Sequence, residues 1–347
     1  MKRHYLISGA ALVACLALTG TPSFAALTIT SAGAADGFSL STFSTLPQSG
    51  PYGSWGSAIL SNGNVVVNGY NPTNLGQTVN FVFSDVDGHT VSSALSTSVW
   101  NDGNYASALA ALNGTVYGTH YSDNTVRVVN LDGSEGAVVS DVGRGGLGAD
   151  AARDSLLVAT DAGIQEIDLT NSNPATNHRV ITTAYADGVT VSADGSRVYG
   201  EIGGAILGYD IASGMLVYTS PGLGSPDGVG IVTSGALAGD LIVNANNGIV
   251  DLINTTTNTV TTIASGGSRG DYVGFDTSNG TLFLSQSDSL LRLSVAGGTI
   301  GGGGGGNTGV PEPATWTAML LGFGIAGGAL RWRRRAPTRF VRHELAV

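Results

Sequence analysis

The sequence predicts an all-β fold, a six-bladed β-propeller, with a seven-bladed propeller as the alternative. Three observations lead to this prediction. A motif recurs about every forty residues, and no amphipathic helix is apparent between Ala26 and Ile300. Glycine contributes 53 of 347 residues, roughly twice its usual share, whereas charged residues make up only 12%. Such a composition suits many short strands joined by tight turns.

The repeat is clearest where an apolar run precedes a turn. Residues 105–117 (YASALAALNGTVY) parallel residues 187–199 (DGVTVSADGSRVY) at equal length. The last five units start 40 to 44 residues apart, which fits four-stranded propeller blades. The six units begin at Ser54, Tyr105, Gly146, Asp187, Asp227 and Asp271.

Turn residues and alternating apolar residues predict the strands inside each unit. In the fourth unit, Asp194-Gly195 marks a hairpin turn after the innermost strand. The strands expected in this unit are 187–191, 197–200, 205–210 and 216–219. Those expected next are 241–244, 248–254 and 260–265 in the fifth unit, and 271–276, 281–285 and 290–294 in the sixth.

The sixth unit lacks a fourth strand, because its sequence continues into Ala-Gly-Gly after residue 294. At the other end, Phe38 to Thr45 is a strand-like run with no partner of its own. We expect this run to complete the last blade, since that closes the ring and removes two open edges.

The N-terminus has the features of a secretory signal peptide, residues 1–25. Lys2 and Arg3 precede an apolar run, and Ser23-Phe24-Ala25 provides small residues for cleavage after Ala25. Residues 12–15 also fit a lipobox, which would make Cys15 a lipidated first residue. Cys15 is the only cysteine, so ordinary cleavage leaves a mature chain without disulfides.

The C-terminal organisation follows from composition. After the propeller, 26–296, comes a glycine-rich linker, 297–309, and then a segment, 310–335, that contains the uncharged run 314–330. As a helix this run spans roughly 25 Å, the low end of what crosses a bilayer. Four arginines follow, which places a basic tail, 336–347, in the cytoplasm and the propeller outside it. An ordinary membrane anchor would need only these features.

Additional residues make the segment resemble the PEP-CTERM sorting signal in its PEPxxW variant. The resemblance implies recognition by a membrane-embedded exosortase, removal of the tail, and delivery to the cell surface or extracellular polysaccharide. Twelve residues follow the arginines, whereas the family's signal is normally near-terminal. The matching residues are Pro311, Glu312, Pro313, Trp316, residues 319–324, Arg331, Arg333, Arg334 and Arg335.

The body between the two signals is strongly acidic. Residues 26–300 contain 23 acidic and 7 basic residues, a net charge of −16. Such a surface repels phosphate backbones and anionic headgroups, which excludes nucleic acid as a partner. It also makes divalent cations suitable counter-ions.

Asp187, Asp227 and Asp271 are the candidate metal ligands. They occupy the same position at the start of the innermost strand in three consecutive units, so we expect them to face one mouth of the central channel. Clustered carboxylates repel unless a cation joins them, and oxygen ligands suit Ca²⁺ or Mg²⁺. The alternative is that each aspartate caps a turn of its own backbone.

The Asp-Gly-Val sequences at 187–189 and 227–229 resemble repeats of the gluconolactonase, strictosidine-synthase and NHL or YVTN propellers. In lactonase-like members a glutamate, asparagines and an aspartate hold a central divalent ion, and the resemblance therefore implies a metal-dependent hydrolase as one reading. This sequence has Ser54, Tyr105 and Gly146 at the equivalent position in its first three units.

No other catalytic set is apparent. His89, His120 and His178 are isolated in the sequence, and no Gly-x-Ser-x-Gly elbow occurs. Residues 143–148 are glycine-rich but precede no helix, so we interpret them as a connection between blades. Aromatic residues that could stack on sugars, or else fill the core, are Tyr52, Trp55, Trp100, Tyr105 and Tyr121.

The sequence therefore predicts an exported protein, held transiently at the inner membrane and then placed at the cell surface or in the extracellular matrix. A binding or scaffold module is the favoured function, with an exosortase-type enzyme and an exopolysaccharide as expected partners. A secreted, metal-dependent, lactonase-like hydrolase is the alternative.

Overall fold

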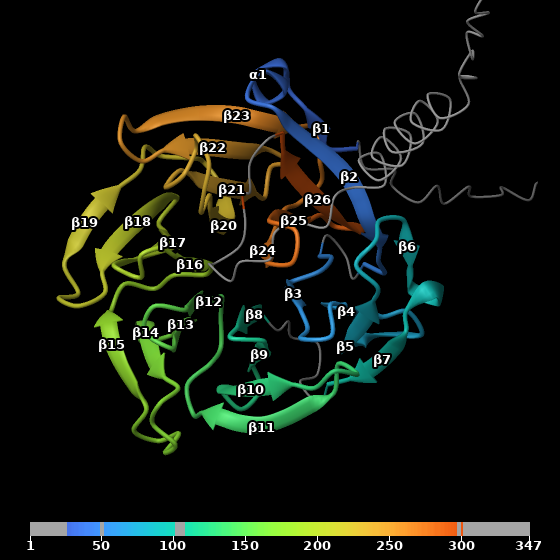
Figure 1. Ribbon diagram of the computed structural model, residues 1–347, viewed down its shortest axis with the longest axis vertical. Helices are drawn as coiled ribbons and strands as arrows, with labels where there is room; N and C mark the ends of the chain where they lie inside the picture. The colour runs from blue at the N-terminus through green and yellow to red at the C-terminus, as the bar shows by residue number, and fades with distance from the viewer. Residues whose placement is uncertain (1–25, 49–51, 101–107, 297–299, 301–347) are drawn as a thin grey trace, which may run out of the picture.

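The computed structural model describes residues 26–48, 52–100, 108–296 and 300. Within these residues six antiparallel sheets surround a central channel, with their innermost strands at the axis and their outermost strands at the perimeter (Figure 1). The six-bladed prediction is confirmed and the seven-bladed alternative is wrong for this part of the chain.

Blades 1 to 5 each take their four main strands from one continuous stretch of sequence, whereas blade 6 does not. Blade 1 contains β3 (Gly56–Ile59), β4 (Val65–Asn71), β5 (Asn74–Phe83) and β7 (Ser96–Val99). Blade 2 contains β8 (Leu109–Leu112), β9 (Thr115–His120), β10 (Thr125–Val129) and β11 (Glu135–Ser140). Blade 3 contains β12 (Leu147–Asp150), β13 (Ser155–Thr160), β14 (Gly163–Asp168) and β15 (His178–Thr182). Blade 4 contains β16 (Val189–Val191), β17 (Arg197–Ile202), β18 (Ala205–Asp210) and β19 (Leu216–Thr219). Blade 5 contains β20 (Pro226–Ile231), β21 (Leu241–Ala245), β22 (Val250–Asn254) and β23 (Thr259–Ser265).

The N-terminal strand β2 (Phe38–Thr45) closes the ring, as predicted. It pairs with β26 (Ser289–Val295), and this pairing places Leu40 opposite Leu293. The sheet of blade 6 continues inward through β25 (Thr281–Ser285) to β24 (Val273–Asp276). Its fourth strand therefore comes from the other end of the chain.

The closure is broader than the sequence predicted. A two-residue strand, β1 (Thr28–Ile29), adds a fifth strand to blade 5 by pairing with β23. A one-turn helix, α1 (Ser31–Ala35), then carries the chain across to β2, and the side chain of Thr30 accepts a hydrogen bond from the backbone N–H of Gly33. The N-terminal segment thus joins two neighbouring blades. No amphipathic helix was expected, and α1 is too short to form a buried face.

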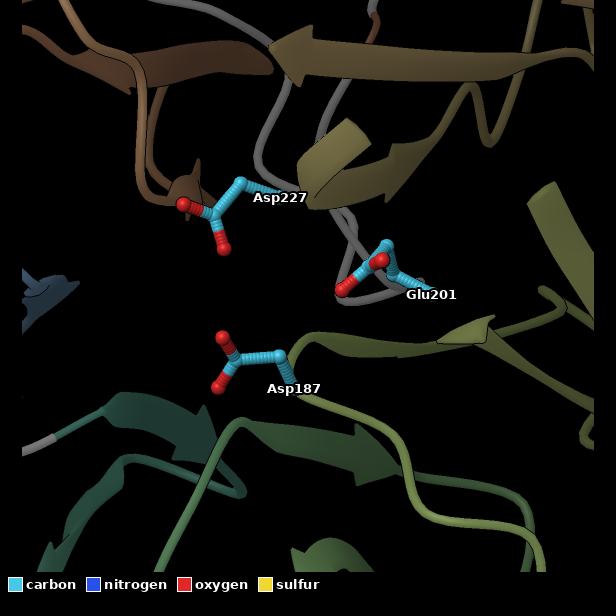
Figure 2. Close-up of side chains that lie close together, drawn as sticks. All are labelled: Asp187, Glu201 and Asp227. Carbon is cyan, nitrogen blue, oxygen red and sulfur yellow. The ribbon is translucent and has the colours of Figure 1, made fainter. Parts of the chain in front are cut away.

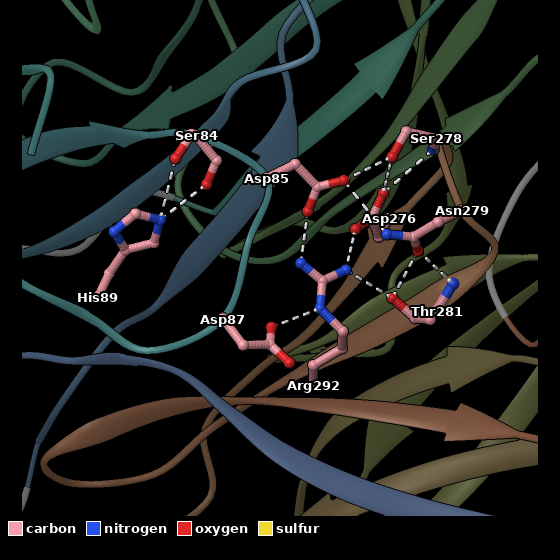
Figure 3. Close-up of polar contacts among 9 residues, drawn as sticks. All are labelled: Ser84, Asp85, Asp87, His89, Asp276, Ser278, Asn279, Thr281 and Arg292. Carbon is pink, nitrogen blue, oxygen red and sulfur yellow. Dashed lines mark hydrogen bonds and ion pairs between the residues drawn. The ribbon is translucent and has the colours of Figure 1, made fainter. Parts of the chain in front are cut away.

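A loop of blade 1 also reaches blade 6. It contains β6 (His89–Thr90), which pairs in parallel with β2, and a 3-10 helix (Val91–Ser93). Beside it, the guanidinium of Arg292 contacts three carboxylates, Asp85, Asp87 and Asp276 (Figure 3). These four residues are called the closure cluster below.

Glycines at the start of the inner strands bring neighbouring blades into backbone contact. A Cβ atom on Gly146 would lie 2.6 Å from the carbonyl oxygen of Asp187, and one on Gly188 would lie 2.7 Å from that of Asp227. Gly228 approaches the backbone of Tyr272 in the same way. The Asp-Gly pairs therefore leave no room for a side chain after the aspartate, and they set the spacing of the aspartates around the channel.

In the described part of the chain, neither helix is long and apolar enough to cross a membrane. The expected signal peptide 1–25, most of the linker and the expected membrane helix 314–330 lie outside the described residues.

Candidate functional site

A cavity of about 170 Å³ opens at the channel end where the innermost strands begin. We call it the mouth. It is lined by the starts of β12, β16, β20 and β24 with the loops that precede them, by the segments that precede β3 and β8, and by the loop between β9 and β10. The side chains that give it its chemical character are Tyr52, Trp55, Tyr121, Arg144, Asp187, Asp227, Arg269 and Asp271.

All three predicted aspartates line the mouth, but their surroundings differ. Asp187 is exposed, whereas Asp227 is only 5% exposed. The guanidinium of Arg269 lies between Asp227 and Asp271, and its Nη2 atom is 2.9 Å from an oxygen of Asp227. Two of the three carboxylates thus share one internal cation.

A fourth carboxylate, Glu201 of β17, does not line the cavity but lies beside the carboxylates of Asp187 and Asp227. One oxygen from each of Asp187, Glu201 and Asp227 lies within 4.8 Å of the others (Figure 2), whereas Asp271 is outside this group. Glu201 was not predicted, because it lies on the second strand of its blade and the predicted carboxylates all start innermost strands. The sequence does contain a signal for Glu201. The second strands of two repeats align, residues 116–119 (VYGT) with residues 198–201 (VYGE), and Glu201 replaces the neutral Thr119 at the aligned position.

Burial and repulsion from neighbouring carboxylates raise the pKa of Glu201, Asp227 and Asp271. Burial raises the pKa of Glu201 to about 7, with a further contribution from Asp187. Burial also raises the pKa of Asp227, and the neighbouring Asp271 and Asp187 add to this while Arg269 opposes it. Desolvation likewise raises the pKa of Asp271. The mouth therefore holds more negative charge than Arg269 balances, and it favours protons or an added cation.

The aspartates of the mouth do not cap turns. Among the described residues, no backbone N–H donates to the carboxylates of Asp187, Asp227 or Asp271. Asp194, at the other end of β16, does accept from the N–H of Ser196 at 3.0 Å, and its hydrogen bonds lower its pKa to about 2. Turn capping thus describes Asp194 and leaves the mouth aspartates available for other contacts.

Three of the predicted aromatic residues meet at the mouth. The rings of Tyr52 and Trp55 make an edge contact with centroids 5.5 Å apart, and Arg269 lies 4.9 Å from the centroid of the Tyr52 ring. Arg144 lies over the Tyr121 ring at 4.1 Å and also pairs with Asp161. Arg144 belongs to the glycine-rich segment 143–148, which connects β11 to β12 as expected.

Trp100, another of the predicted aromatic residues, is not part of this surface. Trp100 is 1% exposed, and its indole N–H donates to the carbonyl oxygen of Gly133, so it is a core residue that joins blades 1 and 2. Burial of its large apolar ring stabilises the fold and leaves the ring inaccessible to a ligand. Tyr105 lies outside the described residues.

A second cavity, of about 460 Å³, opens at the opposite end of the channel. It is lined by the turns that follow the innermost strands, which we call the hairpin face, and by apolar residues such as Leu60, Val191 and Phe275. Tyr272 lines both cavities, and its hydroxyl donates across the channel to the carbonyl oxygen of Leu109. The Tyr272 side chain thus separates the two ends.

Comparison with known proteins identifies the C-terminal segment. Residues 309–335 match the PEP-CTERM protein-sorting motif, so the chain carries this motif. The motif implies export, membrane-anchored sorting and processing by an exosortase-type enzyme. No curated protein matches the chain.

Solved structures resemble the body of the chain. One is a structural genomics protein of unknown function from Bacteroides thetaiotaomicron VPI-5482, which is 10% identical over 74% of this chain and 76% of its own, with a TM-score of 0.55. Another is the WD40 β-propeller domain of Doa1, 14% identical over 73% of this chain and 96% of its own, with a TM-score of 0.49. At such identities the first likeness concerns the fold alone. The body is a β-propeller, consistent with NHL or YVTN-type repeats.

Proposed function

We propose that this chain is an exported propeller of the cell surface or extracellular matrix that binds a polysaccharide at its mouth. The observation that carries the proposal is the meeting of Tyr52, Trp55 and Tyr121 with several carboxylates in one accessible cavity. Apolar ring faces with a few placed polar groups are typical of ligand sites. The PEP-CTERM motif supports the location outside the cytoplasm.

The charges narrow the kind of saccharide. Arg269 is paired with Asp227 and Asp271, and Arg144 is paired with Asp161, so neither arginine is a free anion site. Asp187 and Glu201 add uncompensated negative charge. Carboxylate oxygens accept hydrogen bonds from sugar hydroxyls or amino groups. We therefore expect a neutral or amino-substituted polysaccharide and reject a uronic-acid polymer as the preferred ligand.

Trp55 provides the sharpest test. Replacing its ring by Ala removes the largest stacking surface of the mouth, and we expect affinity for the bound glycan to fall at least about tenfold, or ~1.4 kcal/mol. Binding of the purified propeller to an array of neutral, amino-substituted and acidic oligosaccharides would measure this, with hits followed by calorimetry.

The matched control is Leu216→Ala, which removes an apolar side chain that is 52% exposed on β19 at the perimeter. This variant should bind like the parent protein. Glycan binding that survives both Tyr52→Ala and Trp55→Ala in folded protein would contradict the proposed site. Thermal melting of each variant separates loss of binding from loss of fold.

A second candidate, a metal-dependent hydrolase, is favoured by the grouping of Asp187, Glu201 and Asp227 within 4.8 Å. The donor set fits a hard divalent cation, because it consists of carboxylate oxygens that repel each other without one. A Ca²⁺ or Mg²⁺ ion bound there would polarise a substrate carbonyl.

Calcium and magnesium titrations monitored by thermal melting test this candidate. If the acids bind the ion, the chain should gain about 2.7 kcal/mol of stability at a hundredfold excess over the dissociation constant. Asp187→Asn should abolish the gain, and we choose this residue because Asp227 also holds Arg269. Asp194→Asn, on the same blade but on the hairpin face, is the matched control. If neither Ca²⁺ nor Mg²⁺ changes the melting temperature, the proposal of a metal-dependent hydrolase is wrong.

A further inference from the structure

Ile300 shows where the chain leaves the propeller. It is fully buried, in a core cluster that includes Val232 and Leu282 of blades 5 and 6. Its backbone N–H donates to the carbonyl oxygen of Gly280 at 2.7 Å, and its carbonyl oxygen accepts from the N–H of Thr233 at 3.1 Å. Both polar backbone groups and the side chain of Ile300 are therefore held by the fold, and the point of departure is well defined.

The two residues that hold Ile300 belong to the hairpin face. Thr233 follows the innermost strand of blade 5 and lines the second cavity. Gly280 lies in the turn between β24 and β25, next to Ser278, which lines the same cavity. The mouth lies at the opposite end of the channel, where β20 and β24 begin. The segment that carries the PEP-CTERM motif thus starts on the face turned away from the mouth.

We propose that, while the PEP-CTERM segment holds the protein at the membrane, the hairpin face is turned toward the membrane and the mouth toward the exterior. The partner of the mouth is then an extracellular ligand, and lipid headgroups of the protein's own membrane are not its target. The inference rests on the proposed ligand-binding role of the mouth. Only the thirteen residues 301–313 separate Ile300 from the apolar run 314–330 in the sequence.

The point of departure can be measured by distances between spin labels in the full chain. Cys15→Ser removes the only native cysteine, so that pairs of new cysteines can be labelled. Two doubly labelled variants are compared, and both carry Asn307→Cys in the linker. The second label is Ser61→Cys on the hairpin face in one variant and Tyr185→Cys beside the mouth in the other. Both second sites are accessible to a label, because Ser61 is exposed and Tyr185 is 61% exposed. The mean distance to residue 61 should be shorter than that to residue 185 by about 15 Å, the length of a five-residue strand. Equal or reversed distances would overturn the inference.

Orientation at the membrane is measured on the single variants Ser61→Cys and Tyr185→Cys, each with a donor fluorophore, in vesicles that contain acceptor-labelled lipid. Transfer from residue 61 should be at least about twofold more efficient than transfer from residue 185. Equal transfer from both sites would show that the tether does not orient the propeller and would overturn the proposal. A Trp55→Ala variant should lose glycan binding and keep this difference. A parent protein that binds no glycan but keeps the difference locates a failure in the proposed function alone.

Discussion

The closure cluster and the mouth both contain an arginine paired with aspartates, but the surroundings of the charges differ. In each, one arginine is shared by aspartates from segments far apart in the sequence, as Figure 3 shows for the closure cluster. Arg292 contacts all three carboxylates of the closure cluster, and Ser278 donates further hydrogen bonds to Asp85 and Asp276. In the mouth, Arg269 pairs with the carboxylates of Asp227 and Asp271, and within the described residues neither Asp187 nor Glu201 has an ion pair.

The two regions also differ in how deeply their arginines are buried. The side chain of Arg292 is 10% exposed and stacks near the rings of Phe43 and Phe283, so the closure cluster is packed and each acid is paired. The side chain of Arg269 is 29% exposed and borders a cavity. Surplus negative charge beside open space, and not the number of acids, is the feature on which we base the proposal that the mouth binds a ligand.

The largest expected effect is the loss of Arg292. Arg292→Met keeps most of the apolar stem but leaves Asp85, Asp87 and Asp276 together without a cation, and we expect a loss of about 3–5 kcal/mol of unfolding free energy. Arg269→Met is the matched variant in the mouth. It should cost about 1–2 kcal/mol at neutral pH, because its carboxylates can take up protons and the cavity admits water.

Urea denaturation of the two variants measures these values. Equal losses for Arg292→Met and Arg269→Met would erase the distinction between the two clusters. Asp276→Asn, which removes one of the three charges around Arg292, should cost less than Arg292→Met, because the arginine keeps two partners.

The next effect concerns the uncompensated charge of Glu201. Its pKa is raised from 4.5 to about 7 in the folded chain, so the folded state binds a proton more tightly than the unfolded state. The resulting stability is present below pH 4.5 and is lost as the pH rises toward 7. Glu201→Gln should therefore raise the unfolding free energy by about 1 kcal/mol at pH 8, after allowance for partial exposure, and leave it unchanged near pH 4.

Thermal melting at both pH values in the presence of a chelator checks this effect. A Glu201→Gln variant that is less stable than the parent at pH 8 would indicate that the Glu201 carboxylate has a stabilising partner. Glu166→Gln is a suitable contrast, because Glu166 is paired with Arg179 and its substitution should not stabilise the chain.

The smallest effect tests the hydrogen bonds that complete the closure cluster. Ser278→Ala removes the hydroxyl that donates to Asp85 at 2.9 Å and to Asp276 at 2.6 Å, and we expect a loss of about 1 kcal/mol. Ser196→Ala removes a comparable hydroxyl from the exposed turn at Asp194 and should change stability by less than about 0.5 kcal/mol. Melting curves of the pair give the comparison, and a larger loss for Ser196→Ala would contradict it.

Much of the fold could be predicted because it rests on local periodicity. The forty-residue repeat predicted six blades, and the expected strands 205–210, 216–219 and 281–285 agree with the structure at both ends. The missing strand of blade 6 also identified Phe38 to Thr45 as its complement. Strand β1 and strand β6 could not be predicted, because two residues carry no periodicity and both are held by partners distant in the sequence.

The site was predictable in part for the same reason. Repeat position placed Asp187, Asp227 and Asp271 at strand starts, and the structure brings all three to the mouth. Glu201 and Arg269 lie outside the aligned position, and the contact between Arg269 and Asp227 joins residues 42 apart in the sequence. No local pattern indicates that one aspartate has a cation while another lacks it.

The sequence by itself determined the number of blades, the strand that closes them, the acidity of the body and the C-terminal sorting motif, because each depends on residue order or composition alone. Only the tertiary structure decided which charges neutralise each other, which tryptophan reaches the mouth and from which face the chain departs. Those outcomes depend on distances between blades, and closing the ring sets all of these distances together.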